Sequence, residues 1–214
     1  WFTDDSCRCP YAYGRRQLRP QPFPIWLRAA RRVAMQRCGL HDPDLFPGSC
    51  HVRVYRTGRD ALGWHADGEP LFRGQSGHVP IVSLSVGATR TFAFRLQNDK
   101  VEKTHAVPLS AGDVMVMDGR MQEHYVHSVP RDSSVNGVRV NVTCRWIEQH
   151  RECGPGSRSF VPESVATMSP GALAEGSGSA SVGPLLALEG AQGHPFGDDL
   201  VFSPHLGAGE VTPS

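Results

Sequence analysis

Six short segments with a two-residue alternation of apolar and polar side chains dominate the middle of the chain. They span residues 50–55, 79–86, 90–95, 104–109, 112–117 and 138–146. Successive side chains of a strand point to opposite faces of a sheet, so this period predicts strands. Turn-rich pieces such as RTGRDALG and LQNDK separate them. At least six short strands after a single helix predict a β-sandwich or a double-sheet barrel.

The preceding segment PFPIWLRAARRVAMQRCG, residues 22–39, predicts the helix. Pro24 suits its first turn and Gly39 its end. Apolar residues recur at helical spacing, which predicts a buried stripe. The stripe consists of Trp26, Leu27, Ala30, Val33 and Ala34.

The composition changes near residue 150. Residues 151–214 contain 11 Gly, 9 Ser and 7 Pro and carry a net charge of −5. Such a segment buries too little apolar surface to offset its ordering entropy, which predicts a disordered tail at 151–214 and a folded domain at 1–150. The domain holds 20 basic and 14 acidic residues, a net charge of +6. This charge suits a polyanionic partner, although an ordinary soluble domain also has it.

The six cysteines are scattered, and no C-x-x-C pair exists. We therefore expect neither a structural zinc site nor a disulfide framework, and a reducing intracellular compartment, nucleus or cytoplasm. No apolar run approaches the roughly 18 residues of a membrane helix, so we expect no membrane partner. The chain begins at Trp1 rather than Met, and we interpret it as lacking its natural N-terminus.

The stretch GWHADGE predicts a metal site. His65 and Asp67 are two residues apart, so an extended chain turns both toward one point. A second His-x-acid match, His150 with Glu152, lies at the edge of the predicted tail, and we interpret it as chance. A facial triad of two His and one carboxylate binds Fe(II) and leaves positions open for chemistry.

The third ligand has to come from a distant part of the chain. His78 and His105 lie in turn or strand-start contexts, and HYVHSVP supplies two further histidines after the segment GDVMVM. His124 and His127 are three apart, so an extended chain turns them to opposite faces. Only one of this pair is then a ligand.

The strand VRVNVTCRW separates polar from apolar residues. Arg139, Asn141, Thr143 and Arg145 share one face. A strand with one wet face has this pattern. Two arginines on one face also suit a dicarboxylate, because each guanidinium grips a carboxylate through two hydrogen bonds.

Four stretches resemble the AlkB family of Fe(II)- and 2-oxoglutarate-dependent dioxygenases, nearest to the subgroup that dealkylates nucleic acid bases. They are VYRTGRDALGWHADGE, PIVSLSVGATRTFAFR, LSAGDVMVMDGRMQEHYVHSVP and RVNVTCR. The resemblance covers most of residues 51–146 and implies a mostly β fold, a double-stranded β-helix or jelly-roll core with an N-terminal helix. It also implies Fe(II), 2-oxoglutarate and O2 as cofactor and co-substrates.

The resemblance assigns site residues. His65, Asp67 and His127 match the iron ligands, since the family's distal histidine directly precedes S-x-P. Co-substrate contacts are implied for four residues: Tyr55, Arg139, Asn141 and Arg145. The family has Asn where this chain has Arg53, a departure that affects one co-substrate contact.

The resemblance also implies substrate contacts. Glu69 matches an acidic position that contacts the target base. In the N-terminal lid, Tyr11 and Tyr13 are each able to stack on a base, and we take Tyr13 as the candidate; packing is the alternative. Part of this lid is expected to lie upstream of Trp1.

The implied activity is oxidative dealkylation of 1-methyladenine and 3-methylcytosine in DNA or RNA, coupled to decarboxylation of 2-oxoglutarate to succinate. We expect the protein to be a monomer. One alternative is a 2-oxoglutarate-dependent hydroxylase or demethylase of a protein or small molecule. Another is a binding module without activity, which the complete triad and both arginines argue against.

Overall fold

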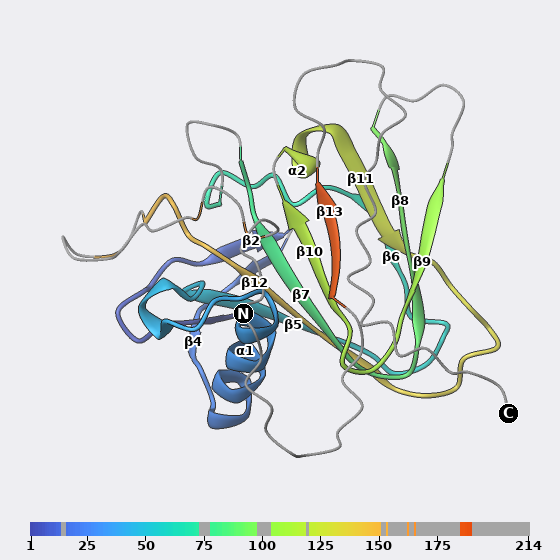
Figure 1. Ribbon diagram of the computed structural model, residues 1–214, viewed down its shortest axis with the longest axis horizontal. Helices are drawn as coiled ribbons and strands as arrows, with labels where there is room; N and C mark the ends of the chain where they lie inside the picture. Colours follow the sequence, from blue (N-terminus) through green and yellow to red (C-terminus); the bar gives the residue numbers. More distant parts are fainter. Residues whose placement is uncertain are drawn as a thin grey trace, which may run out of the picture.

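A computed structural model describes residues 1–13, 16–72, 78–97, 104–118, 120–150, 153, 162, 165 and 185–189 of the chain. Two β-sheets form the body of the molecule, and helix α1 (Ile25–Arg37) lies outside them (Figure 1). The larger sheet runs in the order β13 (Leu185–Glu189), β10 (Val114–Asp118), β7 (Ile81–Gly87), β12 (Arg139–Arg145), β5 (Ser49–Tyr55), β1 (Phe2–Thr3) and β4 (Gln21–Pro22).

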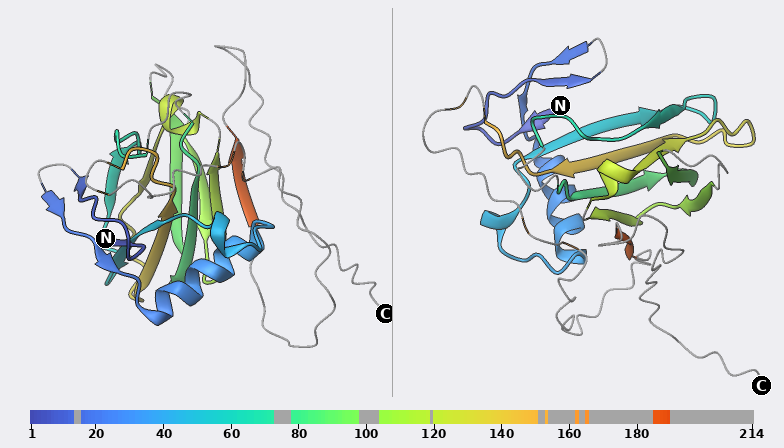
Figure 2. Two further views of the ribbon diagram at one scale, coloured as in Figure 1. Left: turned by 90° about the vertical axis from the view of Figure 1, so that its left-hand side faces the viewer. Right: turned by 90° about the horizontal axis from the view of Figure 1, so that it is seen from above.

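The smaller sheet runs in the order β6 (Leu62–His65), β11 (Tyr125–Val129), β8 (Arg90–Leu96) and β9 (His105–Leu109). A separate hairpin pairs β2 (Tyr11–Tyr13) with β3 (Arg16–Leu18), on the side of the molecule opposite β13 (Figure 2). Short helices cover Pro43–Leu45 (η1) and Met121–His124 (α2). This is the predicted jelly roll. All six predicted strands are present, whereas β6, β11, β13 and the short N-terminal strands were not predicted.

Helix α1 packs on β7 and β12 of the larger sheet. Its buried residues are Leu27, Ala34 and Met35. The predicted stripe is wrong at Trp26 and Val33, which are 53% and 48% exposed. The apolar residues of this helix outnumber those that one face can hold, so spacing alone did not select the buried ones. Gly39 ends the helix as predicted, with a φ of 78° that favours glycine.

The alternation along β12 gives the larger sheet two different faces. Val142 and Cys144 pack in the core beneath α1. Arg139 and Arg145 are buried on the opposite face and line a pocket shared with residues of the smaller sheet. The polar face predicted for this strand therefore points into the interior between the sheets, and the wet-face reading of its two arginines is wrong.

Most of the predicted tail lies outside the described residues, so the boundary at residue 150 stays a prediction. Two described parts of the tail nevertheless contact the domain. Strand β13 pairs in parallel with β10 along five residues. Val165 is buried in the core beneath α1, and its backbone N–H donates to the Asp118 carboxylate at 2.7 Å. Across the described ranges, α1 is the longest helix, and none has the length and apolar character to span a membrane.

Candidate active site

Two histidines face each other across neighbouring strands of the smaller sheet. His65 ends β6 and is paired with His127 on β11. Directly opposite residues of antiparallel strands point to the same face, and the two ring centroids are 4.2 Å apart. With its proton on Nδ1, His65 donates to the Gly63 carbonyl at 2.8 Å, which turns Nε2 toward Asp67. A backbone carbonyl fixes the ring of a metal-binding histidine in this manner.

Asp67 completes the cluster from the loop after β6. Its backbone N–H donates to Gln122 Oε1 at 3.0 Å, and its carboxylate accepts a hydrogen bond from Arg145. Burial opposes ionisation of Asp67, but the Arg145 guanidinium and the two histidines hold its pKa well below its usual range. Asp67 is therefore a carboxylate at neutral pH, which is the form that binds a cation.

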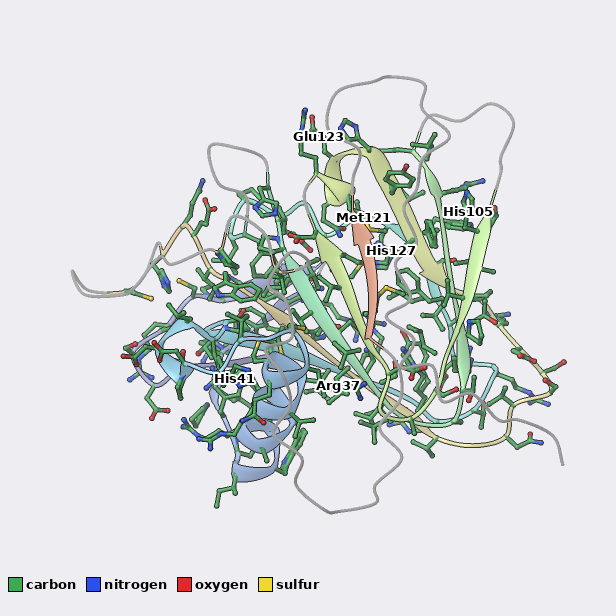
Figure 3. The ribbon with its side chains drawn as sticks, viewed as in Figure 1. Arg37, His41, His105, Met121, Glu123 and His127 are labelled. Atoms are coloured by element: carbon green, nitrogen blue, oxygen red, sulfur yellow. The ribbon has the colours of Figure 1, made fainter. Side chains whose placement is uncertain are left out.

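His127 lies in the interior, stacked on Phe92 with 5.3 Å between the ring centroids (Figure 3). Burial lowers the pKa of His127 to about 4, and the charges of His65 and Arg145 add to the shift against the opposing effect of Asp67. The imidazole is thus neutral at neutral pH, and the neutral ring is the form that ligates metals.

The other candidate histidines lie elsewhere. With its proton on Nε2, His78 donates to the Asp118 carboxylate at 2.8 Å. His105, at the start of β9, stacks on Phe94 of β8. Strand β8 separates β9 from β11, which carries His127. His124 ends α2, three residues before His127. The structure therefore brings together the three residues that the sequence predicts as ligands.

The residues fit a metal ion. One ligand atom of each of His65, Asp67 and His127 lies within 4.8 Å of the other two. Two imidazoles and one carboxylate from one side form the facial arrangement of non-haem iron centres. The chain supplies three ligands here, so the remaining positions are available to a co-substrate and oxygen.

Arg139 enters the same pocket from β12, opposite Tyr55 on β5. The guanidinium lies over the Tyr55 ring, 5.3 Å from its centroid, and Nη2 donates to Ser85 Oγ at 2.9 Å. Its Nε and Nη1 are buried and have no hydrogen-bond partner among the described residues. Buried donors of a guanidinium are costly to leave unpaired, which is the condition expected where a carboxylate binds.

Arg145 has a second set of unpaired donors. Its Nη2 binds Asp67, whereas Nε and Nη1 are buried without a partner in the described part of the chain. The guanidinium lies beside the rings of Tyr11 and Phe72, 5.9 and 5.3 Å from their centroids. Arg145 therefore connects the carboxylate ligand to the pocket in which a dicarboxylate is predicted.

Asn141 lines the pocket between the two arginines, but its hydrogen bonds are already used. Its Nδ2 donates to Ser83 Oγ at 2.8 Å and to the Leu84 carbonyl at 3.1 Å, and its Oδ1 accepts from Thr143. A direct bond to 2-oxoglutarate would replace one of these, so this contact stays a prediction. Arg53, where the family has Asn, also lines the pocket.

The predicted base contacts lie at the side of the pocket formed by the N-terminal segment. The Tyr11 hydroxyl donates to Glu69 Oε1 at 2.9 Å, while Glu69 Oε2 is buried without a partner among the described residues. Tyr11 lines the pocket. Tyr13 follows in β2, but its side chain lies outside the described part. The structure thus places Tyr11 at the site, and the choice of Tyr13 stays a prediction.

Three residues of the site were not predicted. Ser83 and Ser85 hold the polar face of β12, and Gln122 holds the backbone of Asp67. The two serines are spaced by two in a predicted strand, which is a signal for a shared polar face. Gln122 lies in a short helix that the sequence pattern did not reveal, so no signal pointed to it.

Comparisons with known proteins agree with this geometry. The model of the 2OG-Fe(II) oxygenase superfamily matches residues 2–145. Human alpha-ketoglutarate-dependent dioxygenase alkB homolog 3 is 33% identical over 148 residues, 64% of this chain and 48% of that protein. Human DNA oxidative demethylase ALKBH2 is 28% identical over 143 residues, 64% of this chain and 52% of that protein.

A solved structure of OsALKBH1 is 26% identical to this chain, with a TM-score of 0.44. The match covers 60% of this chain and 66% of the OsALKBH1 chain. The chain spans about half the length of the curated relatives it matches. Because the family model matches well over half of the residues, the chain belongs to the 2OG-Fe(II) oxygenase superfamily and is similar within it to AlkB homologues.

Proposed function

We propose that this protein is an Fe(II)- and 2-oxoglutarate-dependent dioxygenase that removes alkyl groups from nucleobases. The observation that carries the proposal is the pocket between the two sheets. It combines the triad of His65, Asp67 and His127 with two buried arginines, each of which has two donor nitrogens without a partner within the described chain. A metal and an anionic co-substrate satisfy both sets of groups together.

Bound Fe(II) with 2-oxoglutarate and O2 would supply the oxidising chemistry, and the chain's residues bind, orient and exclude water. Arg139, stacked on Tyr55, pairs with the distal carboxylate of 2-oxoglutarate. Arg145 holds Asp67 in its charged form and directs its remaining donors to the other end of the co-substrate. Phe92 and Met117 cover the apolar part of the pocket, which limits access of water.

Glu69 supports a nucleobase substrate. Its Oε2 is buried and lacks a partner among the described residues, while the Tyr11 hydroxyl fixes its other oxygen. The exocyclic amines of adenine and cytosine donate hydrogen bonds, and 1-methyladenine and 3-methylcytosine are also cationic, so a carboxylate complements both properties. Guanine and thymine lesions present a carbonyl at that edge, which a carboxylate disfavours.

Two further observations support nucleic acid as the carrier of the base. Residues 1–150 have a net charge of +6, and one relative is named a DNA oxidative demethylase. An enzyme that reacts with a base has to take it out of the stack, which favours damaged, mispaired or single-stranded sites. We extend the proposal to DNA and RNA alike.

A panel of oligonucleotides with single methylated bases tests the substrate, with mass spectrometry of the products after incubation with Fe(II) and 2-oxoglutarate. We expect demethylation of 1-methyladenine and 3-methylcytosine and little of methylated guanine or thymine. If the wild-type protein makes succinate but leaves every oligonucleotide unchanged, the nucleobase assignment is wrong and a protein or small-molecule substrate takes its place.

A further inference from the structure

A second cluster of metal-ligating side chains lies outside the iron site. Cys7 and Cys9 come from the segment between β1 and β2, whereas His150 and Cys153 follow β12. One ligand atom of each lies within 4.8 Å of the other three. Scattered cysteines led us to expect no structural zinc site. The fold nevertheless brings four metal-ligating side chains together, because it joins two ends of the domain that are more than 140 residues apart in sequence.

The distances within the cluster suit tetrahedral zinc. Cys9 Sγ lies 3.4 Å from Cys153 Sγ and 3.8 Å from His150 Nδ1, and the latter two atoms are 3.4 Å apart. Zn–S bonds near 2.3 Å and Zn–N bonds near 2.0–2.1 Å place tetrahedral ligand atoms about 3.6–3.8 Å apart. The three separations among Cys9, His150 and Cys153 are thus close to those of ligand atoms around one zinc ion.

The surroundings of the sulfur atoms point the same way. The backbone N–H of Arg8, between the two N-terminal cysteines, donates to Cys153 Sγ at 3.2 Å. Hydrogen bonds from the chain to coordinating sulfur orient the ligand and are part of how proteins tune metal sites. Cys7 and Cys9 are 4% and 1% exposed. Both thiols are therefore buried in a cluster that also contains His150.

We propose that Cys7, Cys9, His150 and Cys153 bind a structural Zn²⁺ ion. Four ligands from the chain close the coordination shell, as in structural Cys₃His sites, whereas the iron triad leaves positions open. Thiolates and imidazole select zinc, while the two imidazoles and carboxylate of the triad suit Fe(II). The chain therefore holds two different metals in two sites of different chemistry.

The position of the cluster indicates what the zinc would do. Cys9 lies two residues before Tyr11, whose hydroxyl fixes Glu69. His150 follows by five residues Arg145, which holds Asp67. Zinc at this point would tie the N-terminal segment, which forms one wall of the pocket, to the end of β12. A tie between distant segments stabilises a fold most, because it removes the most freedom from the unfolded chain.

Metal analysis of the full-length protein tests the proposal. After expression in zinc-supplemented medium and exhaustive dialysis, we expect about one tightly bound zinc per chain. Cys9→Ser and Cys153→Ser should lose it, whereas Cys38→Ala, which changes a buried cysteine at the C-terminal end of α1, should retain it. Three outcomes would each overturn the site. They are wild-type protein without zinc, zinc retained by both serine variants, and a Cys9–Cys153 disulfide in protein purified under reducing conditions.

Cobalt spectroscopy keeps the test valid if a serine variant fails to fold. Co²⁺ bound by three thiolates should give sulfur-to-cobalt charge-transfer absorption and the intense visible bands of tetrahedral cobalt. The iron triad has no sulfur, so it contributes no charge-transfer band. His150→Cys should keep the metal and strengthen the charge-transfer absorption. Zinc-free wild-type protein that takes up two cobalt ions without this band contradicts the proposal, whatever its oxygenase activity.

Discussion

Arg139 is the residue on which binding of 2-oxoglutarate should depend most. Loss of one partner of a buried charge-assisted pair costs about 2–5 kcal/mol, because the other charge is left unpaired. Arg139→Ala should therefore raise the Michaelis constant for 2-oxoglutarate at least about tenfold in a succinate assay. The exposed Arg131 provides a matched control, and Arg131→Ala should leave the constant unchanged. An unaltered constant in Arg139→Ala would locate the dicarboxylate elsewhere.

Glu69 is the residue that should select the base. Glu69→Gln keeps the shape of the side chain and removes the charge, so turnover of the cationic bases 1-methyladenine and 3-methylcytosine should fall several-fold. Succinate formation without an oligonucleotide should persist, since the triad and Arg139 are intact. Glu123→Gln, which alters an exposed pair with Arg120, serves as the control. Equal turnover in both variants would remove Glu69 from base recognition.

At the scale of elements, strand β13 protects one edge of the larger sheet. It pairs with β10 from Val114 to Asp118, and an uncovered strand edge presents unpaired N–H and C=O groups. Deletion of residues 185–214 should lower the melting temperature, by roughly 2–4 °C for each kcal/mol by which the free energy of unfolding falls. Deletion of residues 190–214, which leaves β13 in place, should have a smaller effect. Identical melting curves of both truncations and the full chain would show that β13 does not stabilise the domain.

Elements with strong local signals could be predicted from the sequence, and elements defined by distant partners could not. The alternation along β12 and the glycine at the end of α1 are local, so both were predicted with nearly correct bounds. Strand β6 is four residues long and becomes a strand through its pairing with β11. Likewise, the Cys₃His cluster depends on contacts between residues 7–9 and 150–153, and no short spacing marks it.

Within the site, residues of distinctive chemistry could be predicted and their supports could not. The spacing of His65 and Asp67 and the two arginines of one strand face carry their own signal. The choice of His127 needed the family resemblance, because spacing alone left His124 open. Tyr11 and Tyr13 are equivalent by sequence, and the contact of Tyr11 with Glu69 depends on how the N-terminal segment packs.

At the scale of the whole molecule, the charge of the domain predicts a salt-dependent interaction. Residues 1–150 carry +6, and a protein that contacts phosphates releases counterions on binding. The Michaelis constant for a methylated oligonucleotide should therefore rise steeply between about 50 and 200 mM salt. The constant for a methylated nucleoside, which lacks a phosphate backbone, is the control and should change little. Equal salt dependence of the two would argue against contact with the backbone.

The central claim is that the pocket between the two sheets holds Fe(II) and 2-oxoglutarate for oxidation, and succinate formation measures it most directly. Succinate from the wild-type protein should require added Fe(II) and should fall to background in His127→Ala. His124→Ala, changed three residues earlier at the end of α2, should retain most of the activity. Succinate formation that persists in His127→Ala, or that is lost only in His124→Ala, would contradict the account.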